Sequence, residues 1–339
     1  MEMQKKRKFT VSASPHVRSG ETTTGIMLDV IIALMPALIA SVIIFGRRAL
    51  AVTAVTVVTS VLAEYISRKV MKRSNTIGDL SAVVTGMLLA FNLPVDIPLW
   101  MAAIGAVVAI VVVKQFFGGI GQNFVNPALV GRIVLMSSFP TAMSTWAQPY
   151  AWKGVAAVTS ASPLAEISTM FNSGDVSSAA FKANQVLPSL GEMFIGQRQG
   201  CLGEVCAVAL ILGGIYLFAR KVISPLIPAL YIGTVAVIMF IAGGGSFTFM
   251  MYEVLGGGLI LGAIFMATDY TTSPINTKGK IIYAIGCGLI TCVIRLFGSL
   301  PEGVSFSIIL MNILVPHIEK LTTPKPFGYV KEKKGAKKA

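Results

Sequence analysis

Long apolar segments alternate with short polar or glycine-rich links through most of this chain. Ten such segments can be delimited, and each contains at most one charged residue, which is typical of helices that cross a bilayer. The first five are expected near Thr24–Phe45, Leu50–Ile66, Ile77–Phe91, Leu99–Val113 and Pro127–Phe139. The second five are expected near Glu204–Phe218, Leu226–Ala242, Phe249–Ala267, Ile281–Leu296 and Val304–Pro316. The pattern therefore predicts an all-α polytopic membrane protein with about ten transmembrane helices.

The two sets of five segments resemble each other, which indicates internal repeats. Gly86–Ala90 (GMLLA) corresponds to Gly262–Met266 (GAIFM), and one segment later Lys114–Gly118 (KQFFG) corresponds to Arg295–Gly298 (RLFG). Five is an odd number, so the second copy would start from the opposite side of the membrane. Several segments are shorter than the roughly 20 residues that a perpendicular span needs, which favours broken or re-entrant helices. The sequence therefore predicts two inverted five-helix repeats.

The formal net charge of +13 is explained by membrane orientation rather than by nucleic-acid binding. Most of the 28 Lys and Arg residues fall where the ten-segment topology places the N-terminal side of the membrane, so both termini are expected in the cytoplasm. The C-terminal lysines would contact lipid headgroups. No cleavable signal peptide is apparent. The expected parts are a cytoplasmic tail (1–23), a first repeat (24–139), an extracytoplasmic loop (140–203), a second repeat (204–318) and a basic cytoplasmic tail (319–339).

The long polar loop contains a hydroxyl-rich stretch, Val158–Leu164. Ser162 before Pro163 is a good helix start, with Ser162 as N-cap and Pro163 at the first helical position. A phosphodiester on the Ser162 hydroxyl would lie at the free N–H groups of that helix, where anions are stabilised. The stretch is therefore either an ordinary helix cap or an attachment point for a phosphate group.

A second polar stretch, Gly118–Pro127, separates the fourth and fifth segments. Glycines and an Asn-Pro pair are typical of a turn that starts a helix. The alternative is a re-entrant backbone in which Gly121, Gln122, Asn123 and Asn126 hydrogen-bond a polar ring, since amides suit the imide edge of a flavin. The residues themselves favour neither alternative.

The remaining polar residues of the apolar segments have simpler interpretations. Asp29, Glu64 and Arg132 are expected to face the bundle interior, because charges at membrane depth are costly. Glu204 opens the sixth segment, as a carboxylate favoured at a helix N-terminus. The four cysteines form two C-x4-C pairs, for which apolar packing is favoured over metal or iron–sulfur ligation. Neither a metal site nor a catalytic side chain is predicted.

Taken together, the motifs resemble the D subunits of Rnf complexes, the NqrB/RnfD family. The motifs that carry this resemblance are, in order, Ser14-Pro15-His16, Gly118-Gly119-Ile120-Gly121-Gln122-Asn123, Asn126-Pro127-Ala128, Ser160-Ala161-Ser162-Pro163-Leu164, Gly200-Cys201-Leu202-Gly203-Glu204, Ala267-Thr268-Asp269, Thr272-Ser273-Pro274, Pro301-Glu302-Gly303 and Met311-Asn312. They cover nearly the whole chain outside its two tails. The resemblance implies a urea-transporter-like inverted repeat.

The resemblance also implies two flavins. One is FMN joined through its phosphate to a threonine in a Ser-Gly/Ala-Thr-Pro-like motif by a flavin transferase; the matching position here is Ser162, flanked by Ser160 and Pro163. This sequence departs from the pattern at the threonine and lacks the usual upstream acidic residue. The other is a non-covalent riboflavin, which we assign to the Gly121–Asn126 stretch. Glu204, in the Gly200–Glu204 motif, is assigned to the cofactor-binding residues as well.

The function that the resemblance implies is electron transfer between reduced ferredoxin and NAD, coupled to Na⁺ or H⁺ translocation across the bacterial cell membrane. The implied partners are the A, B, C, E and G subunits of an Rnf complex, the G subunit in particular because it carries its own FMN. The alternative from another class is a passive solute channel of the same fold. Covalent flavin fluorescence distinguishes the two, and a protein that has lost its flavin is a third possibility.

Overall fold

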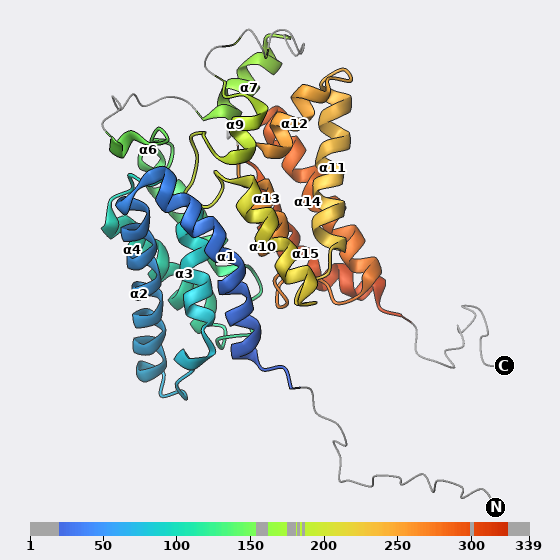
Figure 1. Ribbon diagram of the computed structural model, residues 1–339. Coiled ribbons are helices and arrows are strands. Elements are labelled where there is room, and N and C mark those ends of the chain that lie inside the picture. The colour runs from blue at the N-terminus through green and yellow to red at the C-terminus, as the bar shows by residue number, and fades with distance from the viewer. Residues whose placement is uncertain are drawn as a thin grey trace, which may run out of the picture.

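The computed structural model describes residues 20–153, 162–174, 181, 184, 187–298 and 302–324. This part of the chain is helical and forms two groups of helices that lie side by side (Figure 1). The first group consists of α1 (Thr23–Phe45), α2 (Arg47–Val70), α3 (Ser81–Phe91), α4 (Leu99–Val107), which continues as a π-helical segment (Val108–Gln115), and α5 (Pro127–Ser138). The second consists of α10 (Ala207–Ala219), α11 (Leu226–Ala242), α12 (Phe247–Leu255), α13 (Leu259–Leu261), which continues as a π-helical segment (Gly262–Met266), α14 (Thr277–Phe297) and α15 (Val304–Thr322).

The helices between the two groups lie at one end of the molecule. Among the described residues these are α6 (Pro140–Met143), α7 (Pro163–Asn172) and α9 (Leu190–Ile195). In Figure 1 they lie at the top, whereas α1 begins and α15 ends in the lower half. The polar loop and the two ends of the bundle are therefore on opposite sides.

The predicted all-helical, polytopic organisation is confirmed. Among the described residues, α1, α2, α14 and α15 are long and apolar enough to cross a membrane, and α12 with α13 and its continuation forms a fifth candidate that is bent by 63°. The shorter apolar helices are α3, α4 with its continuation, α5, α10 and α11. Each of the ten predicted segments contains described helix, and the chain is a multi-pass membrane protein.

Three predicted segments are interrupted or begin later as helix in the structure, while others, such as α2, α14 and α15, are longer than predicted. Phe249–Ala267 is not one helix, because the chain breaks at the glycines that follow Leu255. Ile77–Phe91 is interrupted at Leu80, whose φ of 62° is left-handed. The sixth segment begins as helix only at Ala207. In each case a local backbone turn interrupts an apolar run that the hydrophobic pattern alone would extend.

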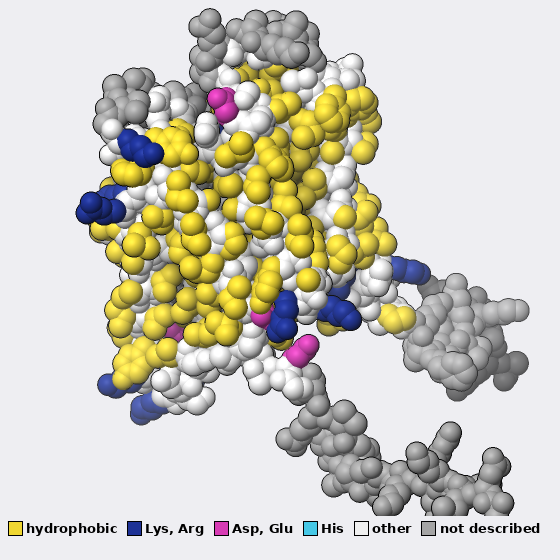
Figure 2. Space-filling view, viewed as in Figure 1, with side chains coloured by type: hydrophobic (Ala, Val, Ile, Leu, Met, Phe, Trp, Pro, Cys, Tyr) yellow, Lys and Arg dark blue, Asp and Glu magenta, His cyan; other side chains and the backbone are white. Residues whose placement is uncertain are grey.

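The outer surface of the bundle is apolar, as lipid contact requires. Figure 2 shows hydrophobic side chains over the middle of the molecule, with Lys and Arg towards its ends. Large aliphatic side chains such as Ile43, Val58 and Ile241 are exposed along α1, α2 and α11. Exposed apolar surface of this extent is unusual for a soluble monomer, so it indicates the face that the bilayer covers.

The two groups meet through equivalent helices. α1 packs against α10, and α5 packs against α15. At the first contact a Cβ on Gly213 would lie 2.0 Å from the Ala33 carbonyl oxygen, so the close approach of α1 and α10 requires glycine there. Within each group the packing is also similar, because α2 contacts α3 and α4 while α11 contacts α12 and α14.

Candidate functional site

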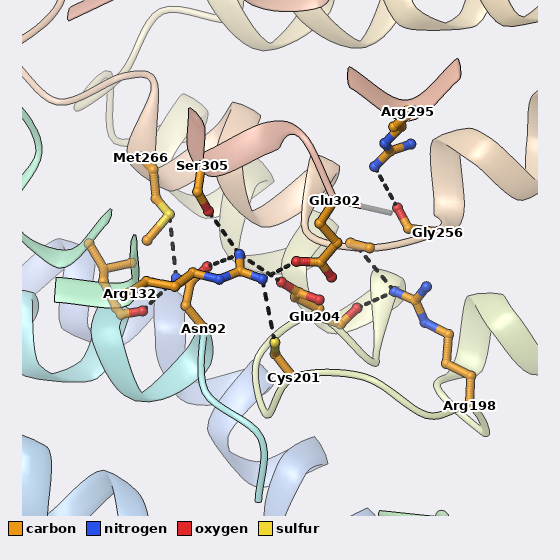
Figure 3. Close-up of polar contacts among 12 residues, drawn as sticks. Asn92, Arg132, Arg198, Cys201, Glu204, Gly256, Met266, Arg295, Glu302 and Ser305 are labelled. Carbon is orange, nitrogen blue, oxygen red and sulfur yellow. Dashed lines mark hydrogen bonds and ion pairs between the residues drawn. The ribbon is translucent and has the colours of Figure 1, made fainter. Parts of the chain in front are cut away.

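A buried arginine, Arg132 of α5, lies where the two groups of helices meet (Figure 3). Its side chain is 2% exposed. One terminal nitrogen donates hydrogen bonds to Asn92 Oδ1 (3.0 Å) and Ser305 Oγ (2.9 Å), and the other pairs with the Glu302 carboxylate. Asn92 belongs to the first group, whereas Ser305 and Glu302 belong to the second. Arg132 therefore joins the two groups, and the expectation that its charge faces the interior is confirmed.

A second carboxylate, that of Glu204, faces the same arginine. Glu204 Oε1 lies 3.5 Å from an Arg132 nitrogen, yet neither carboxylate oxygen has a hydrogen-bond partner in the described part of the chain. Because α10 begins at Ala207, Glu204 is a buried ion-pair partner rather than the helix-terminal carboxylate that we predicted. One arginine, Arg132, thus pairs with two carboxylates.

The thiol of Cys201 completes this cluster. Cys201 Sγ accepts a contact from Arg132 at 3.8 Å, and it lies with oxygens of Glu204 and Glu302 in a group whose atoms are all within 4.8 Å of one another. Such a group has the spacing of metal ligands. Here the Arg132 guanidinium already supplies the positive charge among them, so the arrangement is an ion-pair cluster.

Ser162 lies beside this cluster, at the start of α7. Its hydroxyl oxygen accepts a hydrogen bond from the Ala165 N–H (3.3 Å), and Pro163 occupies the first helical turn, so the predicted N-cap and proline start are confirmed. Ser162 and Pro163 line a small cavity of about 10 Å³ together with Glu204 and Glu302. Ser160, the neighbouring predicted residue, lies outside the described residues.

The same small cavity is lined by Arg198, which the sequence did not single out. Its side chain donates to three backbone carbonyls, those of Val205 (3.3 Å), Glu204 (2.5 Å) and Gly257 (3.4 Å). Arg198 is 4% exposed. Its position in a Gln-Arg-Gln run of the polar loop resembles a solvated charge in sequence, so only the fold shows that it is buried.

A larger cavity of about 270 Å³ is lined by residues of both groups, among them Thr23 and Ile26 at the start of α1. Gly121, Asn123 and Asn126 line it on one side, and Thr268 and Asp269 on the other. The structure therefore brings three of the four residues of the predicted amide-rich stretch to one cavity.

The fourth residue of that stretch, Gln122, is exposed, and its side chain lies against Gly118 instead. The turn interpretation holds as well. Gly121 has a φ of +83°, which favours glycine, and Asn126 caps α5 by accepting from the Ala128 N–H at 3.1 Å. The stretch is thus both a helix start and a cavity wall.

A buried ion pair borders the larger cavity. Lys114 Nζ lies 2.8 Å from Glu64 Oε2 and donates to Ser81 Oγ at 2.5 Å. In the second group Arg295, which corresponds to Lys114 in the repeat, pairs with Glu253 at 3.1 Å. A basic residue recurs at equivalent positions of the two repeats, Lys114 and Arg295, and this recurrence was the feature of the sequence that could have indicated the two ion pairs.

Asp29, by contrast with Glu64, lies at the rim of the bundle. Its carboxylate pairs with Arg220 at 3.3 Å and accepts from the Tyr216 hydroxyl at 2.8 Å. The Arg220 side chain is 59% exposed, so this pair lies where solvent can reach it. The interior position is confirmed for Glu64 and not for Asp29.

Comparison with known proteins identifies the family of the chain. The family model described as NQR2, RnfD, RnfE family matches residues 10–328. The chain is similar to the D subunit of the Na⁺-translocating ferredoxin:NAD⁺ oxidoreductase complex of Acetobacterium woodii, at 46% identity over 332 residues covering 97% of this chain and 98% of that protein. It is also similar to the D subunit of the proton-translocating ferredoxin:NAD⁺ oxidoreductase complex of Clostridium ljungdahlii, at 44% identity over 96% of this chain and 97% of that protein. The chain therefore belongs to the NQR2, RnfD, RnfE family.

Proposed function

We propose that the chain is the D subunit of an ion-translocating ferredoxin:NAD⁺ oxidoreductase, in which flavins carry electrons while Na⁺ or H⁺ crosses the membrane. The similarity over nearly the full length to two relatives that bear this description carries the proposal. One relative is described as sodium-translocating and the other as proton-translocating, so both ions remain in the proposal. Its partners would be the other subunits of the complex, the G subunit in particular, and a flavin transferase.

We further propose that the two groups of helices are inverted repeats, 24–139 and 204–318, with both termini in the cytoplasm. The pairing of α1 with α10 and of α5 with α15 supports a twofold relation between the groups. The position of α6, α7 and α9 opposite the start of α1 and the end of α15 supports an extracytoplasmic loop at 140–203 (Figure 1). In this proposed topology Ser162 would lie on the outer face.

The proposed covalent cofactor is FMN, esterified through its phosphate to Ser162 Oγ. The local geometry fits a phosphate, since the hydroxyl stands at the N-terminus of a ten-residue helix where the backbone N–H groups favour an anion. Pro163 is buried and holds the first turn of that helix in place. When bound, FMN exchanges one or two electrons, and the protein sets its position and its access to water.

Replacing Ser162 with alanine should abolish covalent flavin, because the esterified oxygen is removed. The measurement is in-gel fluorescence of denatured protein co-expressed with a flavin transferase, followed by mass mapping of the peptide Gly154–Lys182. The modified peptide should exceed its sequence mass by one FMN less one water. Ser162→Thr keeps the hydroxyl and should remain fluorescent.

Ser168→Ala, in the same helix, is the matched control and should not alter the fluorescence. A fluorescent Ser162→Ala protein would move the attachment to another hydroxyl. A passive solute channel would show no flavin even in the unmodified chain, and that result would remove the redox proposal.

The proposed second cofactor is a non-covalent riboflavin in the larger cavity. The cavity is close to the lower end of the roughly 300–1,000 Å³ typical of small-molecule sites, and its amides suit the imide edge of the ring. Asn123→Leu should weaken flavin binding by roughly fivefold, the effect of one lost hydrogen bond of about 1 kcal/mol. Flavin released on denaturation of the Ser162→Ala protein is the measurement.

Gln122→Leu changes the neighbouring amide, which is exposed and away from the cavity. It should leave the released flavin unchanged. Equal losses from the two variants would contradict the assignment of Asn123 to the cavity.

A further inference from the structure

Arg198 is buried and forms no ion pair with a carboxylate of the described residues. Its three described hydrogen bonds all go to backbone carbonyls, and none of the described carboxylates lies within 4.0 Å of it. Burying a charge is costly unless an opposite charge pairs with it. The three carbonyls accept from Nε and from one terminal nitrogen of Arg198 but supply no full negative charge, so the environment of Arg198 favours an anion.

The two nearest acidic residues are already engaged elsewhere. Glu302 pairs with Arg132, and Glu204 Oε1 lies 3.5 Å from the same arginine (Figure 3). The backbone of Glu204, and not its carboxylate, is what Arg198 contacts. The cluster therefore contains two arginines and two carboxylates, with both carboxylates directed at Arg132.

The small cavity connects Arg198 with Ser162. Both residues line it together with Glu204 and Glu302, whose carboxylates pair with Arg132. Its volume of about 10 Å³ matches the space that one water-sized group needs. One phosphate oxygen is a group of that size. The hydroxyl of Ser162 also lies at the N-terminus of α7, so the helix end and the guanidinium favour negative charge at the same place.

We infer that Arg198 is the counter-ion of a phosphodiester carried on Ser162 Oγ. This inference rests on the proposed attachment of FMN at that hydroxyl and adds the residue that positions its phosphate. Charge-assisted contacts of arginine with phosphate oxygens are among the strong hydrogen bonds of proteins. Arg198 would thus hold the phosphate beside the junction of the two groups of helices.

The first test measures covalent flavin per chain by intact mass in the full-length protein co-expressed with its transferase. Arg198→Gln should lower occupancy by about tenfold, because a buried phosphate without its counter-ion is disfavoured. Arg198→Lys keeps the charge but not the fork of donors, and should retain at least about half of the occupancy. If Arg198 only anchored the three backbone carbonyls, Arg198→Gln and Arg198→Lys should lower flavin occupancy equally.

Arg48→Gln is the matched control, because Arg48 also donates to a backbone carbonyl, that of Ile97 at 3.1 Å. It should not alter flavin occupancy. Occupancy of Arg198→Gln equal to that of the unmodified chain would overturn the inference and leave the covalent flavin itself intact.

The second test needs neither flavin nor transferase. Phosphoserine is introduced at position 162 by amber suppression, both in the chain that retains Arg198 and in the Arg198→Gln variant. Phosphoserine at position 168 in the same two backgrounds is the control. With Arg198, ³¹P NMR should show the second pKa of the phosphoserine at position 162 below its ordinary value of about 6, and Arg198→Gln should restore that value. The control at position 168 should titrate alike in both backgrounds.

The two tests separate the inference from the proposed function. A chain that carries no flavin but shows the lowered phosphate pKa would reject FMN at Ser162 and support the anion site. A flavinylated chain whose phosphoserine titrates alike with and without Arg198 would reject the anion site alone.

Discussion

Arg132→Gln is expected to destabilise the folded protein by about 3–5 kcal/mol, the range for removal of one partner from a buried ion pair. The reason is that Glu302 and Glu204 would both lose the arginine that they face, inside a buried cluster. The measurement is the fraction of monodisperse protein that survives heating in detergent, followed across temperature.

Arg220→Gln serves as the control, because Arg220 pairs with Asp29 at a largely exposed position. Exposed pairs contribute about 0–1 kcal/mol, so this variant should remain close to the unmodified protein. Combining Arg132→Gln with Glu302→Gln should recover part of the loss. Equal melting of the Arg132 and Arg220 variants would show that the buried cluster does not hold the two groups of helices together.

The second large effect is expected from Lys114→Met, which leaves Glu64 uncompensated. The Glu64 side chain is 0% exposed, and apart from Lys114 it accepts only from the Thr76 hydroxyl (2.7 Å) among the described residues. We expect a loss of about 3–5 kcal/mol, measured by the same heating assay.

A double replacement tests the cause. Lys114→Met with Glu64→Leu removes both charges and should return stability to within roughly 1–2 kcal/mol of the unmodified protein, because apolar residues of similar volume often substitute for a buried pair without loss. Lys69→Met, at an exposed position of α2, is the matched control. A double variant as unstable as the single one would mean that shape and not charge causes the loss.

The two buried clusters lie in different places, since Arg132 joins the two groups of helices whereas Lys114 and Glu64 both belong to the first group. Arg132 with its carboxylates lies beside the small cavity and Ser162, whereas Lys114 with Glu64 borders the larger cavity. Each proposed flavin site is therefore adjacent to a fixed pair of opposite charges. Such fixed charges set the electrostatic environment of a bound redox group without needing to move.

The order and type of the helices could be read from the sequence alone, because lipid contact and the apolar core demand the same residues along each segment. α11 begins and ends as predicted, at Leu226 and Ala242, since a long uniform apolar run leaves few alternatives to a helix. The N-cap at Ser162 followed by Pro163 was likewise predictable, because capping depends on neighbours within one turn.

Only the tertiary structure decided which polar groups meet. Arg132, Glu204 and Glu302 are far apart in the chain and come together because α5, the turn before α10 and the start of α15 converge. The same convergence buries Arg198, which reads as an ordinary loop residue, and leaves Gln122 outside the cavity that Asn123 lines. Periodicity and capping are local properties of a chain, whereas charge pairing across a bundle depends on distances that only packing sets.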